Sequence, residues 1–91
     1  MEIEPGEQLD PTGPTAPYMQ IAAVLRRRIE RGDFPANTRI PTESDLVAVF
    51  EVARTTARRA IALLREEGLV YTVPQRGTFV AERKPGDGTD K

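Results

Sequence analysis

The sequence contains no cysteine and no histidine among its 91 residues. Without cysteine, the chain cannot form disulfides, thiolate metal sites or cysteine nucleophiles. Without histidine, it lacks the commonest general base and metal ligand. No apolar run approaches the ~20 residues of a membrane-spanning helix, and the acidic first residues do not form a secretory signal. These absences predict a soluble cytoplasmic protein that binds a partner, is not an enzyme and needs no cofactor or metal.

Charge is unevenly distributed along the chain, although the formal net charge is only −1. Residues 1–17 contain four acidic residues, four of the eight prolines and no basic residue. Residues 18–81 contain ten arginines and seven acidic residues, a net charge of +3. Residues 82–91 are polar and include proline and glycine. The composition therefore predicts a disordered acidic leader over 1–17, one mildly basic domain over 18–81 and a flexible polar tail over 82–91.

Three stretches of the central domain carry helix signals. Apolar residues recur every four positions over 18–31, and a glycine follows the last of them. A second helix is expected to open after Thr42, which can form a capping box with Asp45, and to end near residue 51. The third expected helix covers 54–67 and also ends before a glycine.

The sequence then changes to β type. Residues 69–73 and 78–81 read as two strands, and the turn signal between them predicts a hairpin. The order of helix, helix, tight turn, helix and hairpin predicts an α+β fold of the winged helix-turn-helix kind. In that fold, three helices are followed by a C-terminal two-stranded β-hairpin, the wing.

Arginines gather on one side of the third expected helix, opposite its apolar stripe. They are Arg54, Arg58, Arg59 and Arg65, and Glu66 is the only acidic residue on that side. A solvated face normally mixes both signs of charge, and like charges four residues apart destabilise a helix slightly. This face therefore indicates an anionic partner. Because guanidinium groups match phosphates and guanine edges, double-stranded DNA is the predicted partner.

Other residues offer weaker signals for the same partner. The hydroxyls of Thr55 and Thr56 at the start of the third helix can bind phosphate. Arg76, at the expected hairpin turn, has a side chain that fits a minor groove. A second group of arginines, within 26–31, is better interpreted as a solvated helical face than as a second phosphate contact.

Four motifs occur in order and with regular gaps within 18–81. They are Pro41-Thr42-Glu43, Arg54-Thr55-Thr56-Ala57-Arg58, Glu67-Gly68-Leu69 and Arg76-Gly77-Thr78-Phe79-Val80. With these motifs the domain resembles the GntR (gluconate-repressor-like) family of bacterial transcription regulators. The resemblance implies a sequence-specific DNA-binding regulator, located in the cytoplasm and associated with the nucleoid.

The resemblance also implies roles for single residues. Arg54 and Arg58 would contact bases in the major groove, the two threonines after Arg54 would contact bases or phosphates, and Gly77 would let the wing approach the minor groove. The candidate DNA-binding residues are therefore Thr42, Ser44, Arg54, Thr55, Thr56, Arg58, Arg59, Arg76 and Gly77.

The chain departs from the usual family pattern at three of its motif positions. Ala53 replaces a common hydroxyl residue, Ser44 replaces a common arginine, and Gln75 replaces a common first glycine of the wing. The first two departures remove side chains that contact DNA. The third predicts a stiffer wing turn.

Most family members carry a C-terminal effector-binding domain, whereas this sequence ends about ten residues after the expected wing. Either it is an excised DNA-binding domain or it is a natural short form, which the initiator methionine and polar tail favour. We accordingly expect no small-molecule effector site in this chain. Reading a pseudo-palindromic operator would take two copies roughly 34 Å apart, which leaves a homodimer on DNA open. A winged-helix protein–protein interaction module is the alternative function, because the domain is only weakly basic.

Overall fold

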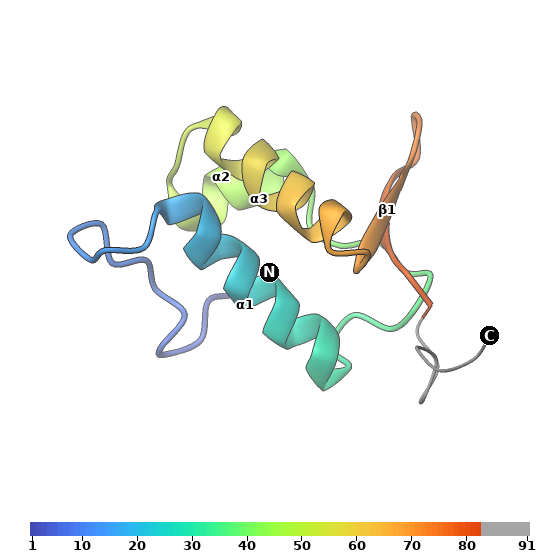
Figure 1. Ribbon diagram of the computed structural model, residues 1–91, viewed down its shortest axis with the longest axis horizontal. Helices are drawn as coiled ribbons and strands as arrows, with labels where there is room; N and C mark the ends of the chain where they lie inside the picture. Colours follow the sequence, from blue (N-terminus) through green and yellow to red (C-terminus); the bar gives the residue numbers. More distant parts are fainter. Residues whose placement is uncertain (83–91) are drawn as a thin grey trace.

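The computed structural model describes residues 1–82 (Figure 1). Its elements in chain order are α1 (Pro17–Arg31), α2 (Glu43–Phe50), α3 (Arg54–Glu66), β1 (Val70–Val73) and β2 (Gly77–Val80). The two strands pair antiparallel, with Val70 opposite Val80 and Val73 opposite Gly77. Three helices followed by a hairpin confirm the predicted fold. The observed bounds differ from the expected ones by about one residue.

One apolar core joins the three helices to the hairpin. α3 contacts both α1 and α2, and α1 lies along it in Figure 1. The side chains with no exposed surface include Ile21 and Leu25 of α1, Leu46 of α2 and Leu64 of α3. Since the core takes the apolar stripe of α3, the arginine side of that helix is left exposed.

A short segment before α2 extends the hairpin, which the sequence analysis did not predict. Ile40 N donates to Thr78 O at 2.9 Å, and Val80 N donates to Thr38 O at 2.9 Å. Between these bonds, Arg39 forms a β-bridge with Phe79. The wing is therefore tied to the chain that leads into α2.

The capping box predicted for α2 is present. Asp45 N donates to Thr42 Oγ1 at 3.0 Å, and Thr42 N donates to Asp45 Oδ2 at 2.9 Å. The backbone hydrogen bond from Thr42 lowers the pKa of the Asp45 carboxyl, because it stabilises the charged form. The box fixes where α2 begins.

The structure places the acidic leader, for which the composition predicts disorder, against α1. Pro5 and Gly6 are the central residues of a β-turn in which Glu7 N donates to Glu4 O at 2.9 Å. Gly6 takes a φ of +91°, which only glycine adopts readily. Only 1% of Glu7 is exposed. The proline and glycine interpreted as signs of disorder are turn formers here, and the acids find basic partners on α1.

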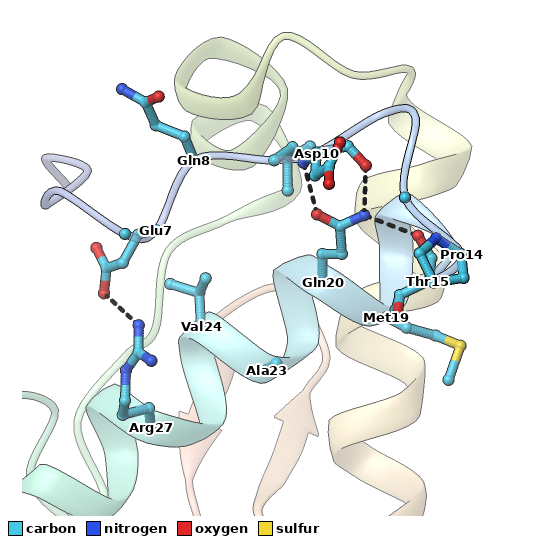
Figure 2. A pocket seen from close by; sticks show the side chains of 13 residues that line it. Glu7, Gln8, Asp10, Pro14, Thr15, Met19, Gln20, Ala23, Val24 and Arg27 are labelled. Carbon is cyan, nitrogen blue, oxygen red and sulfur yellow. Dashed lines mark hydrogen bonds and ion pairs between the residues drawn. The ribbon is translucent and has the colours of Figure 1, made fainter.

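The second half of the leader is held by Gln20 of α1. The Gln20 side chain accepts from Asp10 N at 2.8 Å and donates to the carbonyl oxygens of Asp10 and Thr15 at 3.0 and 2.7 Å (Figure 2). Leader and α1 together line a cavity of 370 Å³. Three ordered amide contacts thus fix a segment that carries few apolar side chains.

Two further predictions concern the C-terminal tail and membrane-spanning helices. Of the predicted tail over 82–91, only Glu82 lies within the described residues. Among the helices of the described part, none has both the length and the apolar character to cross a bilayer.

Candidate nucleic-acid interface

A groove runs between the start of α2, the exposed side of α3 and the hairpin. It has a volume of 420 Å³. Five of the nine candidate DNA-binding residues line it, and they are Thr42, Ser44, Arg54, Arg58 and Gly77. The groove forms because the core orients α3 with its arginines outward, while the capping box starts α2 beside them.

Glu43 lies between the two arginines at the centre of the groove. The Arg58 Nε to Glu43 Oε2 distance is 3.3 Å, and Arg54 Nη1 lies 3.5 Å from Glu43 Oε1. Both guanidinium groups keep more than half of their side-chain surface exposed, at 53% for Arg54 and 57% for Arg58. Pairs this exposed contribute little to stability. Their geometry nevertheless holds the two arginines side by side, with one positive charge in excess.

Glu43 is a member of the site that was not among the predicted DNA-binding residues. The signal was available, because Glu43 is the third residue of the Pro41-Thr42-Glu43 motif. Glu43 precedes Arg54 and Arg58 by 11 and 15 residues in the chain. These pairs could not be predicted from the sequence, because only residues three or four apart on one helix are neighbours by spacing alone.

Ser44 and Arg65 complete the polar lining at the two ends of the groove. Arg54 Nη2 donates to Ser44 Oγ at 3.1 Å. At the other end, Arg65 Nη1 donates to Thr72 Oγ1 at 2.9 Å, and Thr72 lies 3.2 Å from Thr78 Oγ1 across the hairpin. Arg65 therefore links the last turn of α3 to the wing.

Four candidate residues do not line the groove. The Arg59 guanidinium lies over the ring of Tyr18 in α1, 4.1 Å from its centroid. Arg59 is exposed but faces α1 rather than the groove, so it lies apart from Arg54 and Arg58. Thr55 and Thr56 lie in the first turn of α3, exposed and half-buried respectively, and Arg76 is exposed on the wing turn.

The wing turn includes a non-glycine residue in the left-handed region. Arg76 N donates to Val73 O at 3.0 Å, and Gln75 takes a φ of +65°, in the region that favours glycine. The next residue, Gly77, has a φ of +125°. A Cβ there would lie 3.2 Å from Arg39 Nε. Gly77 thus lets Arg39 pack beside the wing, which adds a basic side chain that the sequence analysis did not assign.

Comparison with known proteins gives a consistent family match. The family model described as "Bacterial regulatory proteins, gntR family" matches residues 17–80. A transcriptional regulator of the HTH type from Rhizobium meliloti is 48% identical over 74% of this chain and 27% of its own length. The histidine utilization repressor of Pseudomonas putida is 36% identical over 79% of this chain and 29% of its own length. The chain thus spans less than a third of the length of these curated relatives.

The solved structures show the same fold. The DNA-binding domain of AraR, crystallised with its operator ORX1, superposes with a TM-score of 0.75 and 35% identity. The match covers 89% of this chain and 99% of that one. A GntR family regulator from Listeria monocytogenes superposes with a TM-score of 0.75 and 31% identity, over 82% of this chain and 64% of its own.

Proposed function

The chain belongs to the GntR family of bacterial regulatory proteins, and we propose that it acts as a sequence-specific DNA-binding transcription regulator. The observation that carries this proposal is the groove, where Arg54 and Arg58 lie together, more than half exposed and only partly neutralised. Bidentate guanidinium contacts to guanine are the commonest specific readout of the major groove. The partner is double-stranded DNA in the cytoplasm, at the nucleoid.

The groove suggests a division of roles. Arg54 and Arg58 read base edges, because they lie one helical turn apart on the exposed side of α3. Thr42 and Ser44 contact the backbone from the start of α2, and Thr55 and Thr56 do so from the first turn of α3. The wing residues Arg76 and Gly77 approach the minor groove, and Arg59 supports α3 through Tyr18 and contacts phosphate at the edge of the interface.

Two copies on a pseudo-palindromic operator fit this interface. One recognition helix reads one half-site, and a second copy is needed for the other half, one helical turn of DNA away. We propose a homodimer that forms on DNA.

The test begins with selection of bound sequences from a random duplex pool. Titrations then compare the selected duplex with a scrambled one for wild type, Arg58→Ala and Thr56→Ala. We expect Arg58→Ala to weaken the selected duplex by about 1–3 kcal/mol more than the scrambled one. Thr56→Ala should weaken both about equally. Arg26→Ala is the matched control, because Arg26 pairs with Glu67 at 2.8 Å and does not line the groove.

Salt dependence provides a second readout. Four to six phosphate contacts would give a log–log slope of about −4 to −5 for the wild type. A slope near zero would contradict binding to the DNA backbone. Equal losses on both duplexes for Arg58→Ala would contradict the base-reading role. The interaction-module alternative predicts no DNA binding. The arginines that line the groove weaken this alternative, because the cores of protein–protein interfaces are depleted of charged residues.

A further inference from the structure

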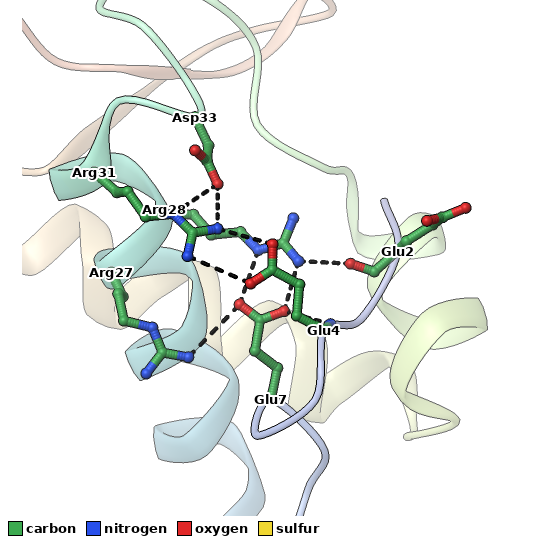
Figure 3. A network of polar contacts seen from close by, with 7 residues as sticks. All are labelled: Glu2, Glu4, Glu7, Arg27, Arg28, Arg31 and Asp33. Atoms are coloured by element: carbon green, nitrogen blue, oxygen red, sulfur yellow. Dashed lines mark hydrogen bonds and ion pairs between the residues drawn. The ribbon is translucent and has the colours of Figure 1, made fainter.

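A second group of arginines lies on α1, where carboxylates of the acidic leader pair with it (Figure 3). Arg28 Nε donates to Glu7 Oε2 at 3.0 Å, and Arg27 Nη2 lies 3.6 Å from the same oxygen. Arg31 Nη2 lies 3.0 Å from Glu4 Oε2 and also pairs with Asp33. The sequence analysis interpreted this face as solvated. The structure pairs each of these arginines with carboxylates, but Arg27 and Arg31 stay 55% and 42% exposed, so only the buried Arg28 departs from that interpretation.

The pairing at Glu7 is the tightest part of this α1 arginine cluster, which we define as Arg27, Arg28 and Arg31. The side chains of Arg28 and Glu7 are 9% and 1% exposed. Hydrogen bonding from Arg28 lowers the pKa of the Glu7 carboxyl to about 2, although burial acts in the opposite direction. Glu7 in turn raises the pKa of Arg28. Both groups are therefore held charged.

We propose that the α1 arginine cluster is a second binding surface for the phosphate backbone of duplex DNA, and that the leader occupies it in place of DNA. The leader presents its carboxylates through the Pro5-Gly6 turn, which sets Glu4 and Glu7 close together over α1. A second hydrogen bond, from Glu4 N to Glu7 Oε1 at 2.9 Å, orients the Glu7 side chain.

The dimensions of the cluster suit a phosphate strand. From Arg27 to Arg31 the helix rises about 6 Å, and successive phosphates of one strand are about 3.4 Å apart along the duplex axis. Three long guanidinium side chains can therefore reach two or three phosphates. DNA is the polyanion that this chain meets under the proposed function, and the present inference rests on that function only for the choice of polyanion.

Ion pairs and hydrogen bonds, more than apolar contacts, hold the leader on α1. It contributes two half-buried apolar side chains, Ile3 and Leu9, to the edge of the core. Its ion pairs with α1 are polar contacts, so a polyanion and its counterions compete with them directly. None of the three cluster arginines lines the groove, so the cluster is separate from it. By pairing its carboxylates with the cluster, the leader neutralises it, limits sequence-independent binding and so raises the specificity ratio.

The test compares Glu7→Gln with Glu2→Gln in the full chain, using a labelled duplex of scrambled sequence. Each variant removes one negative charge. Glu2 is the matched control, because only its main-chain carbonyl contacts Arg28 and its carboxylate points away from the cluster (Figure 3). We expect Glu7→Gln to bind the duplex several-fold more tightly than Glu2→Gln. Its log–log salt slope should be steeper by about two, one for each uncovered phosphate contact.

Two further sets of variants show which surface is responsible for the gain in duplex affinity of Glu7→Gln. Adding Arg27→Ala and Arg31→Ala to Glu7→Gln should remove this gain in affinity. Adding Arg54→Ala and Arg58→Ala should leave it, which separates this inference from the proposed function of the groove. Circular dichroism confirms folding. If Glu7→Gln does not fold, Glu4→Gln takes its place, since Glu4 is half-exposed and pairs with Arg31 alone among the α1 arginines. Equal affinities and slopes for the glutamate variant and Glu2→Gln would overturn the proposal.

Discussion

Replacing Glu7 by alanine distinguishes a folded leader from a disordered one. If residues 1–17 were disordered, as their composition predicts, Glu7→Ala would be a surface change worth less than about 0.5 kcal/mol. In the structure, Glu7 is 1% exposed and bound by Arg28, whose side chain is 9% exposed. Its removal leaves a buried guanidinium with only a carbonyl partner, that of Glu2.

Two independent routes give the size of the effect. Breaking a buried ion pair by removing one partner costs about 3–5 kcal/mol. The lowering of the Glu7 pKa from 4.5 to about 2 corresponds to about 3 kcal/mol of stability at neutral pH. The two routes agree. For a domain of this size, such a loss lowers the Tm by roughly 12–24 °C.

The pH dependence has a definite sign. Because folding lowers the pKa of Glu7, its contribution is complete above pH 4.5 and is lost as the pH falls toward 2. The difference in unfolding free energy between wild type and Glu7→Ala should therefore be constant from neutral pH down to about 5. Below pH 5 this difference in unfolding free energy should shrink, because protonation of Glu7 in the wild type removes the charge that Arg28 binds.

Urea denaturation of wild type, Glu7→Ala and Glu2→Ala measures this difference. Glu2→Ala is the control, because it keeps the main-chain carbonyl that binds Arg28. We expect it to stay within about 0.5 kcal/mol of wild type. If Glu7→Ala is as stable as Glu2→Ala at neutral pH, the leader is not held by this pair and the reasoning fails.

Three further predictions concern the groove and the wing. Glu43→Gln should raise affinity for a scrambled duplex and lower the preference for the selected one in parallel titrations, because it removes a charge that opposes DNA and orients the two groove arginines. Gln75→Gly should raise the unfolding free energy by up to about 1 kcal/mol, since it relieves a positive φ; an unchanged urea midpoint would count against strain in the wing turn. Thr42→Ala should lower the unfolding free energy measured in urea by about 1 kcal/mol. Thr42→Ser should lose much less, because serine can accept the same hydrogen bond from Asp45 N.

Local signals predicted the elements, because they depend on neighbours in the chain. The apolar period of α1, the capping box of Thr42 and Asp45, and the wing turn with its unfavourable Gln75 all depend on residues within one or two turns. The exposed side of α3 could also be predicted from the sequence, since the helical period alone places Arg54 and Arg58 opposite the apolar stripe that faces the core.

Long-range partners could not be predicted in this way. Composition assigned the leader to disorder, because nothing in residues 1–17 indicates that Arg28 lies beneath Glu7, 21 residues away. Arg59 shows the same limit, since its position on the helix is local but its contact with Tyr18 depends on how α1 packs on α3.

The sequence by itself determined the order of the elements, the family resemblance and the arginine side of α3. Only the tertiary structure decided which charges compensate which. Glu43 lies between two arginines of another helix, and the leader neutralises arginines of α1. The physical reason is that periodicity and capping depend on bonds within a few residues, whereas ion pairing depends on distances that exist only after the helices have packed around their common core.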